Sequence, residues 1–127
     1  MRALVALAFC LLATMGVSDA ACLKASDDNQ QAEGRLLSIR FTVEAYRRTE
    51  QAYILQLSSP ACLEGADEYD KVDTSPRIHV FSMDDAMRKR MRGLVGKNVR
   101  VTGNAFGEHT AHHHAPIVMS ISTINRL

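Results

Sequence analysis

The sequence predicts a mainly β fold, a small five-stranded barrel with one short helix between its third and fourth strands. Apolar and polar residues alternate in five short segments, and a helical spacing of apolar residues separates the third from the fourth. A glycine inside the fourth segment indicates a bulge or a sharp bend. This order fits an OB-fold-like Greek-key barrel, with an open α+β sandwich as the competing architecture. The length of 127 residues suits one hydrophobic core.

Residues 1–20 have the layout of a secretory signal peptide. A short positive segment opens the chain, residues 3–13 are all apolar, and small residues stand at Ser18 and Ala20, before the expected cleavage site. The apolar run is about half as long as the roughly 20 residues of a transmembrane helix, so we expect no membrane span after cleavage. The mature protein is then a single OB-like domain, residues 21–127, located in the periplasm or secreted.

Two cysteines remain after this cleavage, Cys22 and Cys62. In an oxidising compartment an even number of cysteines favours pairing, so we expect a disulfide between them. It would close a loop of about 40 residues and contribute about 3–4 kcal/mol in the chain-entropy model. The pair lacks the C-x-x-C spacing of redox and metal sites, which favours a structural role.

The first three strands are predicted from alternation. After a polar stretch, residues 24–32, apolar side chains occupy every second position of 37–43 and again of 53–57. A short apolar run, residues 78–81, forms the third strand. Residues 60–73, which contain a proline, Cys62 and an acidic run, are expected to form a solvated loop.

A helix follows the third strand. Ser82 and Asp85 resemble a capping box, and Gly96 fits the position just past the helix end. Methionines on one helical face could bind copper through their thioethers, but core packing explains the same spacing better. The basic residues of 88–92 are interpreted as a solvated face. The apolar residues at helical spacing are Met83, Met87, Met91 and Leu94.

The last two strands are predicted over residues 99–105 and 117–121, with Gly103 as the bulge in the first of them. Their connection carries four of the five histidines. In an OB barrel this connection and the one between the first two strands border the usual binding face. We therefore expect residues 46–50 to lie near the histidines. The expected ligand-binding residues are Tyr46, Arg47, Arg48 and His113.

Imidazole groups are good ligands of zinc, copper and nickel, so the histidine segment is also a candidate metal site. If residues 112–114 are extended, His112 and His114 project to one face. His109 or Glu108 would fold back as a third ligand. The alternative is structural, with imidazoles that hydrogen-bond the loop backbone or Thr110. The sequence leaves both readings open, and the orientation of His79 as well.

Composition excludes several functions. A formal charge of +1, no Trp and only seven Phe and Tyr residues leave few surfaces for stacking bases, so no nucleic-acid partner is expected. No nucleophile–base pair, phosphate loop or dinucleotide motif is visible. The sequence therefore favours a non-enzymatic binding or interaction module for an envelope protein or a small ligand. Metal binding through His109, His112 and His114 is the alternative.

The chain resembles a small exported bacterial family that is known only as a domain of unknown function. The most specific part is the segment Thr110-Ala111-His112-His113-His114-Ala115-Pro116, which continues the similarity of residues 94–107. Gly34 and the segments around Cys22, 53–57 and Cys62 match the same family. The resemblance implies an exported OB-like domain with paired cysteines, and it implies no reaction.

Overall fold

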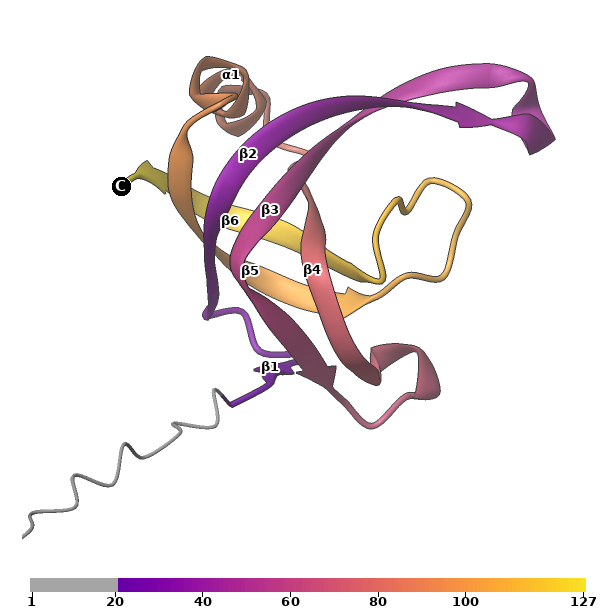
Figure 1. Ribbon diagram of the computed structural model, residues 1–127, viewed down its shortest axis with the longest axis vertical. Coiled ribbons are helices and arrows are strands. Elements are labelled where there is room, and N and C mark those ends of the chain that lie inside the picture. The colour runs from indigo at the N-terminus through magenta and orange to yellow at the C-terminus, as the bar shows by residue number, and fades with distance from the viewer. Residues whose placement is uncertain (1–20) are drawn as a thin grey trace, which may run out of the picture.

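The computed structural model describes residues 21–127, so the predicted signal peptide lies outside the described residues. Figure 1 shows long curved strands that wrap around one another, with a short helix at one end. No helix in this part of the chain is long and apolar enough to cross a membrane. The elements are β1 (Leu23–Lys24), β2 (Gln30–Val43), η1 (Glu44–Tyr46), β3 (Arg48–Glu64), η2 (Glu68–Asp70), β4 (Val72–Phe81), α1 (Asp85–Leu94), β5 (Asn98–Gly107) and β6 (Ile117–Arg126).

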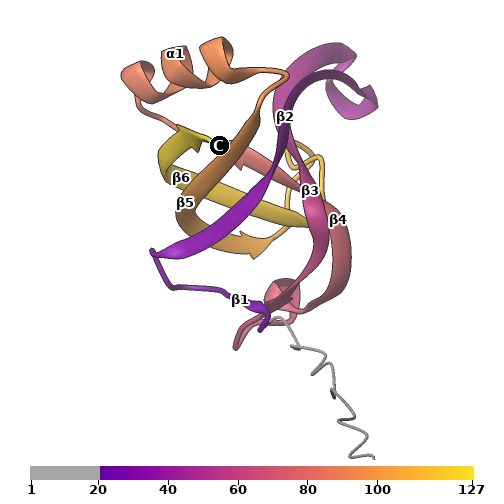
Figure 2. The same ribbon diagram turned by 60° about the vertical axis from the view of Figure 1, so that its left-hand side comes forward.

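Five of the strands close a mixed barrel in the order β3-β2-β5-β6-β4, and β4 pairs back with β3. The β4–β6 pairing is parallel and the other pairings around the barrel are antiparallel. Figure 2 shows α1 lying across one end of this barrel. The predicted five-stranded barrel, with its helix between the third and fourth barrel strands, is confirmed.

The barrel encloses one apolar core. Its strands contribute alternate residues, as expected when one face of a sheet is buried. Gly103 follows a register shift in the β5–β6 ladder, which confirms the predicted bulge. A Cβ atom at this glycine would lie 2.1 Å from the Ser120 carbonyl oxygen, so the close approach of the two strands requires it. The core includes Leu36, Leu55, Ile78, Val80, Met91, Val99, Val101, Ile117, Met119 and Ile124.

The helix differs from its prediction at the first turn. Asp84 is the N-cap and accepts the Met87 N–H at 2.9 Å, while the Ser82 hydroxyl accepts the Asp84 N–H one step earlier. Met83 therefore lies before the helix and is 81% exposed, because it precedes the cap. Met87 packs on the core as predicted, together with the buried Met91. Gly96, with a φ of 84°, follows the helix end as predicted.

The strands β2, β3 and β4 extend beyond their predicted ranges. β2 begins at Gln30, inside the polar stretch, because its first residues pair with β5. β3 runs on to Glu64 and β4 begins at Val72, so the predicted loop of residues 60–73 shrinks to the η2 connection. Register shifts between Gln56 and Leu63 break the regular alternation there, and the partners of this part of β3 are distant in sequence.

The predicted disulfide joins Cys22 to Cys62. It lies beside the short parallel pairing of β1 with the end of β3, where Leu23 is opposite Leu63. The bond therefore fastens the amino-terminal segment of the domain to the middle of the chain.

Replacing both cysteines by serine should lower the free energy of unfolding by about 3–4 kcal/mol, because the unfolded chain then loses the loop constraint. Urea denaturation followed by circular dichroism measures the change, with the oxidised wild type and the reduced wild type side by side. Reduction should reproduce the effect of the substitutions. Equal unfolding midpoints for all three samples would contradict a stabilising role for this disulfide.

Candidate functional site

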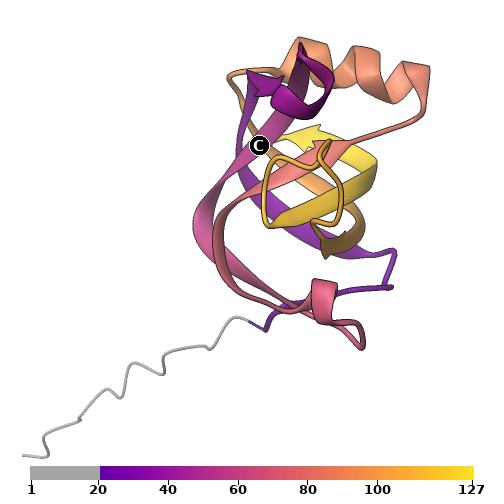
Figure 3. The same cartoon turned by 90° about the vertical axis from the view of Figure 1, so that its right-hand side faces the viewer.

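Three connections of the barrel meet on one face, which we call the site face. They are the tip of the β2–β3 hairpin (residues 44–50), the loop between β5 and β6 (residues 108–116) and the turn at η2 (residues 67–70). Figure 3 looks onto this face, with the β5–β6 loop between the hairpin and the η2 turn. Ring contacts from the loop reach both neighbours, at Tyr46 and at Tyr69. The expectation that residues 46–50 lie near the histidines is thus confirmed.

The β5–β6 loop is held in shape by its own hydrogen bonds. Its ends are joined by the Glu108 N–H, which donates to the Pro116 carbonyl at 3.0 Å. Thr110 organises the turn, because its carbonyl accepts the His113 N–H and its hydroxyl accepts the His112 N–H. The His109 N–H donates to Nδ1 of His113 at 3.1 Å. Backbone groups thereby fix the direction in which each imidazole projects.

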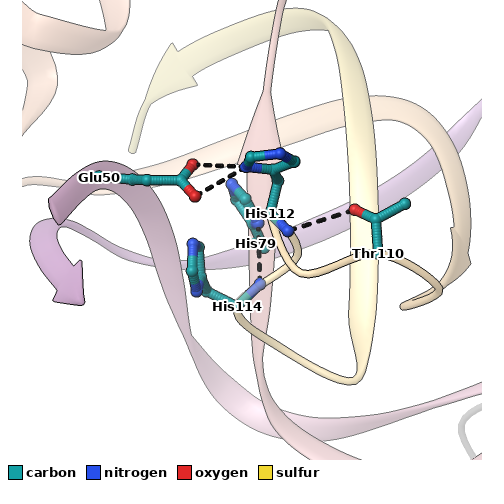
Figure 4. A network of polar contacts seen from close by, with 5 residues as sticks. All are labelled: Glu50, His79, Thr110, His112 and His114. Atoms are coloured by element: carbon teal, nitrogen blue, oxygen red, sulfur yellow. Dashed lines mark hydrogen bonds and ion pairs between the residues drawn. The ribbon is translucent and has the colours of Figure 1, made fainter. Parts of the chain in front are cut away.

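His112 links the loop to the hairpin. Its Nδ1 lies 2.7 and 2.9 Å from the two carboxylate oxygens of Glu50 and donates its hydrogen to them, which leaves Nε2 as the acceptor nitrogen (Figure 4). The ring stacks on Tyr46 with centres 5.3 Å apart and planes 6° apart. The guanidinium carbon of Arg48 lies 5.5 Å from the centre of the same tyrosine ring. His112 therefore contacts Glu50 through a hydrogen bond and Tyr46 through ring stacking.

His79 and His114 form the inner part of the site face. Nδ1 of His79 accepts the His114 N–H at 3.2 Å, and His79 is only 8% exposed (Figure 4). The His114 ring stacks on Phe41 with centres 4.2 Å apart. Its Nε2 is buried and has no hydrogen-bond partner among residues 21–127. His79 thus points inward and holds the loop from below, an orientation that the sequence left open.

Burial keeps two of these imidazoles neutral. It lowers the pKa of His79 from 6.5 to about 4, and the nearby His114 and His113 lower this pKa further while Glu50 acts in the opposite direction. The pKa of His113 is also lowered, first by burial and then by His109. Near neutral pH both rings therefore serve as uncharged hydrogen-bond acceptors and as packing surfaces.

Aromatic and imidazole rings are concentrated on the site face to a degree that composition alone did not indicate. Of the Phe, Tyr and His residues in 21–127, all but Tyr53 take part in ring pairs. His113 is packed edge-on against both Phe106 and His109. The connected network consists of Phe41, Tyr69, His79, Phe81, Phe106, His109, His113 and His114.

The structure does not assemble the predicted metal ligands. Within residues 21–127, no three His, Cys, Asp or Glu side chains are placed to hold a metal ion together. His109 is turned toward the Gly107 carbonyl, which its Nδ1 contacts at 3.1 Å, His112 toward Glu50 and His114 toward Phe41. Glu108 is exposed and contributes its backbone N–H to the loop.

The predicted ligand-binding residues lie on the site face with different surroundings. Tyr46 is 54% exposed and Arg48 stands against it, while His113 is half-buried inside the loop. Arg47 is exposed and ends η1 in a left-handed backbone conformation. Sequence reasoning placed residues 46–50 near the histidines without assigning a role to Glu50, and it missed Phe41, Phe106 and the η2 turn. Phe106 is close to His109 in sequence, whereas pairing between distant strands brings Phe41, Glu50 and the η2 turn to the histidines.

Fold and site together define a small β-barrel domain with a histidine-rich loop over one face. Residues 77–125 match the family model of a domain of unknown function, DUF4431. The matched segment runs from the middle of β4 through α1 and β5 to the end of β6 and contains the histidine loop. No curated protein and no solved structure matches the chain.

The pH dependence of stability should report on His79. The unfolded imidazole, with its ordinary pKa of 6.5, takes up a proton before the folded one, whose pKa is about 4. Stability is therefore complete above pH 6.5, and about 1–3 kcal/mol of it is lost as the pH falls from about 6.5 to 4. Urea unfolding at a series of pH values measures this loss.

His79→Asn retains an acceptor for the His114 N–H and does not titrate in this range, so the decline should become smaller. His112→Asn, which changes an exposed imidazole of the same cluster, is the matched control. Its stability should fall with pH as much as that of the wild type. An unchanged pH profile in His79→Asn would show that His79 is not the group responsible.

Proposed function

We propose that this protein is an exported, non-enzymatic binding module of the OB-fold type, which takes its ligand on the site face. The order of its barrel strands and the place of its helix support the OB comparison. In such barrels the connections that correspond to residues 44–50 and 108–116 border the binding surface. Export to the periplasm or the medium is supported by the layout of residues 1–20 and by the disulfide.

The observation that carries the proposal is the contact of His112 with both Tyr46 and Glu50. It ties two separate connections into one continuous surface before any ligand arrives. A surface that is ordered in advance loses less conformational entropy on binding. Tyr46 is 54% exposed and Arg48 lies against it, so an aromatic ring and a cation are presented together at the outer end of this surface.

The imidazoles also favour binding over catalysis. Nδ1 of His79 and Nδ1 of His113 each accept a backbone N–H, and burial lowers the pKa of both rings. These groups shape the loop. A polar surface of this kind, built on stacked rings, suits an envelope protein or a small ligand as partner.

A benzophenone side chain placed at Tyr46 tests the face in living cells. We expect light-dependent cross-links to an envelope component from this position and none from Met83, an exposed control residue next to the helix. Charge reversal of Arg47 and Arg48 should reduce the cross-link because both cations lie beside the probe. Reversal of Lys89 and Arg92 on α1 is the matched control and should leave it unchanged. Cross-links that persist after the Arg47 and Arg48 changes would show that the partner does not depend on these two cations.

Transition-metal binding is the second candidate, and one observation favours it. A carboxylate that holds Nδ1–H of an imidazole, as Glu50 does for His112, is the usual support behind a metal-bound histidine. Zinc, copper and nickel are the metals to consider. Because His109 and His114 have other partners, the loop would have to rearrange to bring them to the same ion.

Calorimetric titration with zinc separates the two candidates. Under the binding-module proposal, the wild type and the His112→Ala/His114→Ala variant should bind zinc equally, with dissociation constants on the order of millimolar. Glu50→Gln serves as a third sample, because it weakens the support of His112 and leaves both histidines in place. A micromolar site in the wild type that is lost in the double variant would establish the metal candidate instead.

A further inference from the structure

A second feature of the site face lies at the η2 end, away from Tyr46 and Arg48. A hollow of about 430 Å³ opens there, between the η2 turn and the start of the β5–β6 loop. Its volume is within the range of small-molecule sites in proteins. Carboxylates and rings line it together. The lining residues are Asp67, Tyr69, Asp70, Phe106 and His109.

Hydrogen bonds and close packing link the residues that line this hollow. The Gly107 N–H donates to Oδ1 of Asp70 at 2.9 Å, and Oδ1 of Asp67 accepts the Tyr69 N–H. A Cβ atom at Gly107 would lie 1.4 Å from the Tyr69 carbonyl oxygen, so the turn is packed directly on the backbone of β5. Two hydrogen bonds from backbone N–H groups to carboxylates and one close backbone contact therefore hold this part of the hollow together.

The carboxylates retain capacity for a ligand. A carboxylate offers about four acceptor positions, and each of these two uses one oxygen for a backbone N–H. Neither Asp67 nor Asp70 forms a salt bridge with any residue of 21–127. Residues 64–73 carry five acidic side chains and one lysine, so the local charge is negative.

Aromatic and imidazole rings also line the hollow. His109 lies between Tyr69 and Phe106, with ring centres 6.2 and 5.6 Å away. Nδ1 of His109 contacts the Gly107 carbonyl, so Nε2 is the acceptor nitrogen of the neutral ring. Tyr69 is 64% exposed and offers a π face to the solvent. Aromatic faces beside carboxylates are the surroundings that a cation with an alkyl chain prefers.

We propose that this hollow binds an alkylammonium group. An ammonium carries a positive charge and donates hydrogen bonds, and the lining of the hollow offers it the carboxylates of Asp67 and Asp70. A bare metal ion fits less well, since no three His, Cys, Asp or Glu side chains of residues 21–127 are placed around one ion. The chain of the ligand would lie on Tyr69 and Phe106.

This inference rests on the proposed function, because it names the chemistry of one end of the same face. The ammonium could belong to a free diamine or to a lysine side chain of a partner protein. Both sources present the same group, and the experiment below distinguishes them. The Tyr46 cross-link tests the other end of the face, so either proposal can fail alone.

The test is calorimetric titration of the protein purified from the cell envelope, at low salt because screening weakens exposed charges. The probes are 1,5-diaminopentane, a short peptide with one lysine, and zinc chloride. The Asp67→Asn/Asp70→Asn variant retains side-chain oxygens that can accept the backbone N–H groups but removes both charges. It should weaken ammonium binding at least about tenfold. Tyr69→Leu should weaken it about two- to fivefold. Asp73→Asn, a charge in the same acidic segment outside the hollow, should change it less than about twofold.

Binding of the diamine alone would support a free amine as ligand, and binding of the peptide alone would support a lysine of a partner. Unfolding midpoints of the variants, measured in parallel, show that each is folded. The proposal is overturned if neither amine binds, if the Asp67→Asn/Asp70→Asn variant binds as tightly as the wild type, or if zinc is the only ligand.

Discussion

The pairing of β3 with β4 closes the barrel, and the site face depends on this closure. The ladder places Ile54 opposite His79 and Tyr53 opposite Val80, so the carboxylate of Glu50, a few residues earlier on β3, comes to the histidine loop. The parallel pairing of β4 with β6 then sets where that loop ends, because Ile117 is opposite Ile78. Without the closure, Glu50, His79 and His112 would belong to three unrelated surfaces.

The site face uses its histidines mainly as neutral, ordered rings. Burial lowers the pKa of His79 and of His113, and a backbone N–H occupies one nitrogen of each. The exposed His112 differs, since a carboxylate holds its Nδ1–H and an aromatic ring covers one of its faces. Polar and stacking contacts thus divide the face into a packed interior around His79 and an accessible rim at Tyr46 and His112.

Local patterns were sufficient for the barrel and insufficient for much of the site. Alternation predicted the strands, the spacing of Met87 and Met91 predicted the packed side of the helix, and Gly103 predicted the bulge. The ends of β2 and β3 were missed because their polar residues are held by partners far away in the chain. The proximity of 46–50 to the histidines could be predicted from the expected barrel, but the inward direction of His79 and the docking of η2 on Gly107 could not. These two contacts depend on three-dimensional packing, which no periodic pattern in the sequence predicts.

The β2–β3 hairpin extends well beyond the barrel wall, as Figure 1 shows, and its tip meets the histidine loop through the stacked pair of Tyr46 and His112. A two-stranded ribbon that projects into water has few contacts to limit its bending. The Tyr46–His112 stack and the Glu50–His112 hydrogen bond join this ribbon to the β5–β6 loop. Within residues 21–127 no backbone hydrogen bond joins the two segments, so we expect an external molecule that holds one of them to limit the other through these side chains alone.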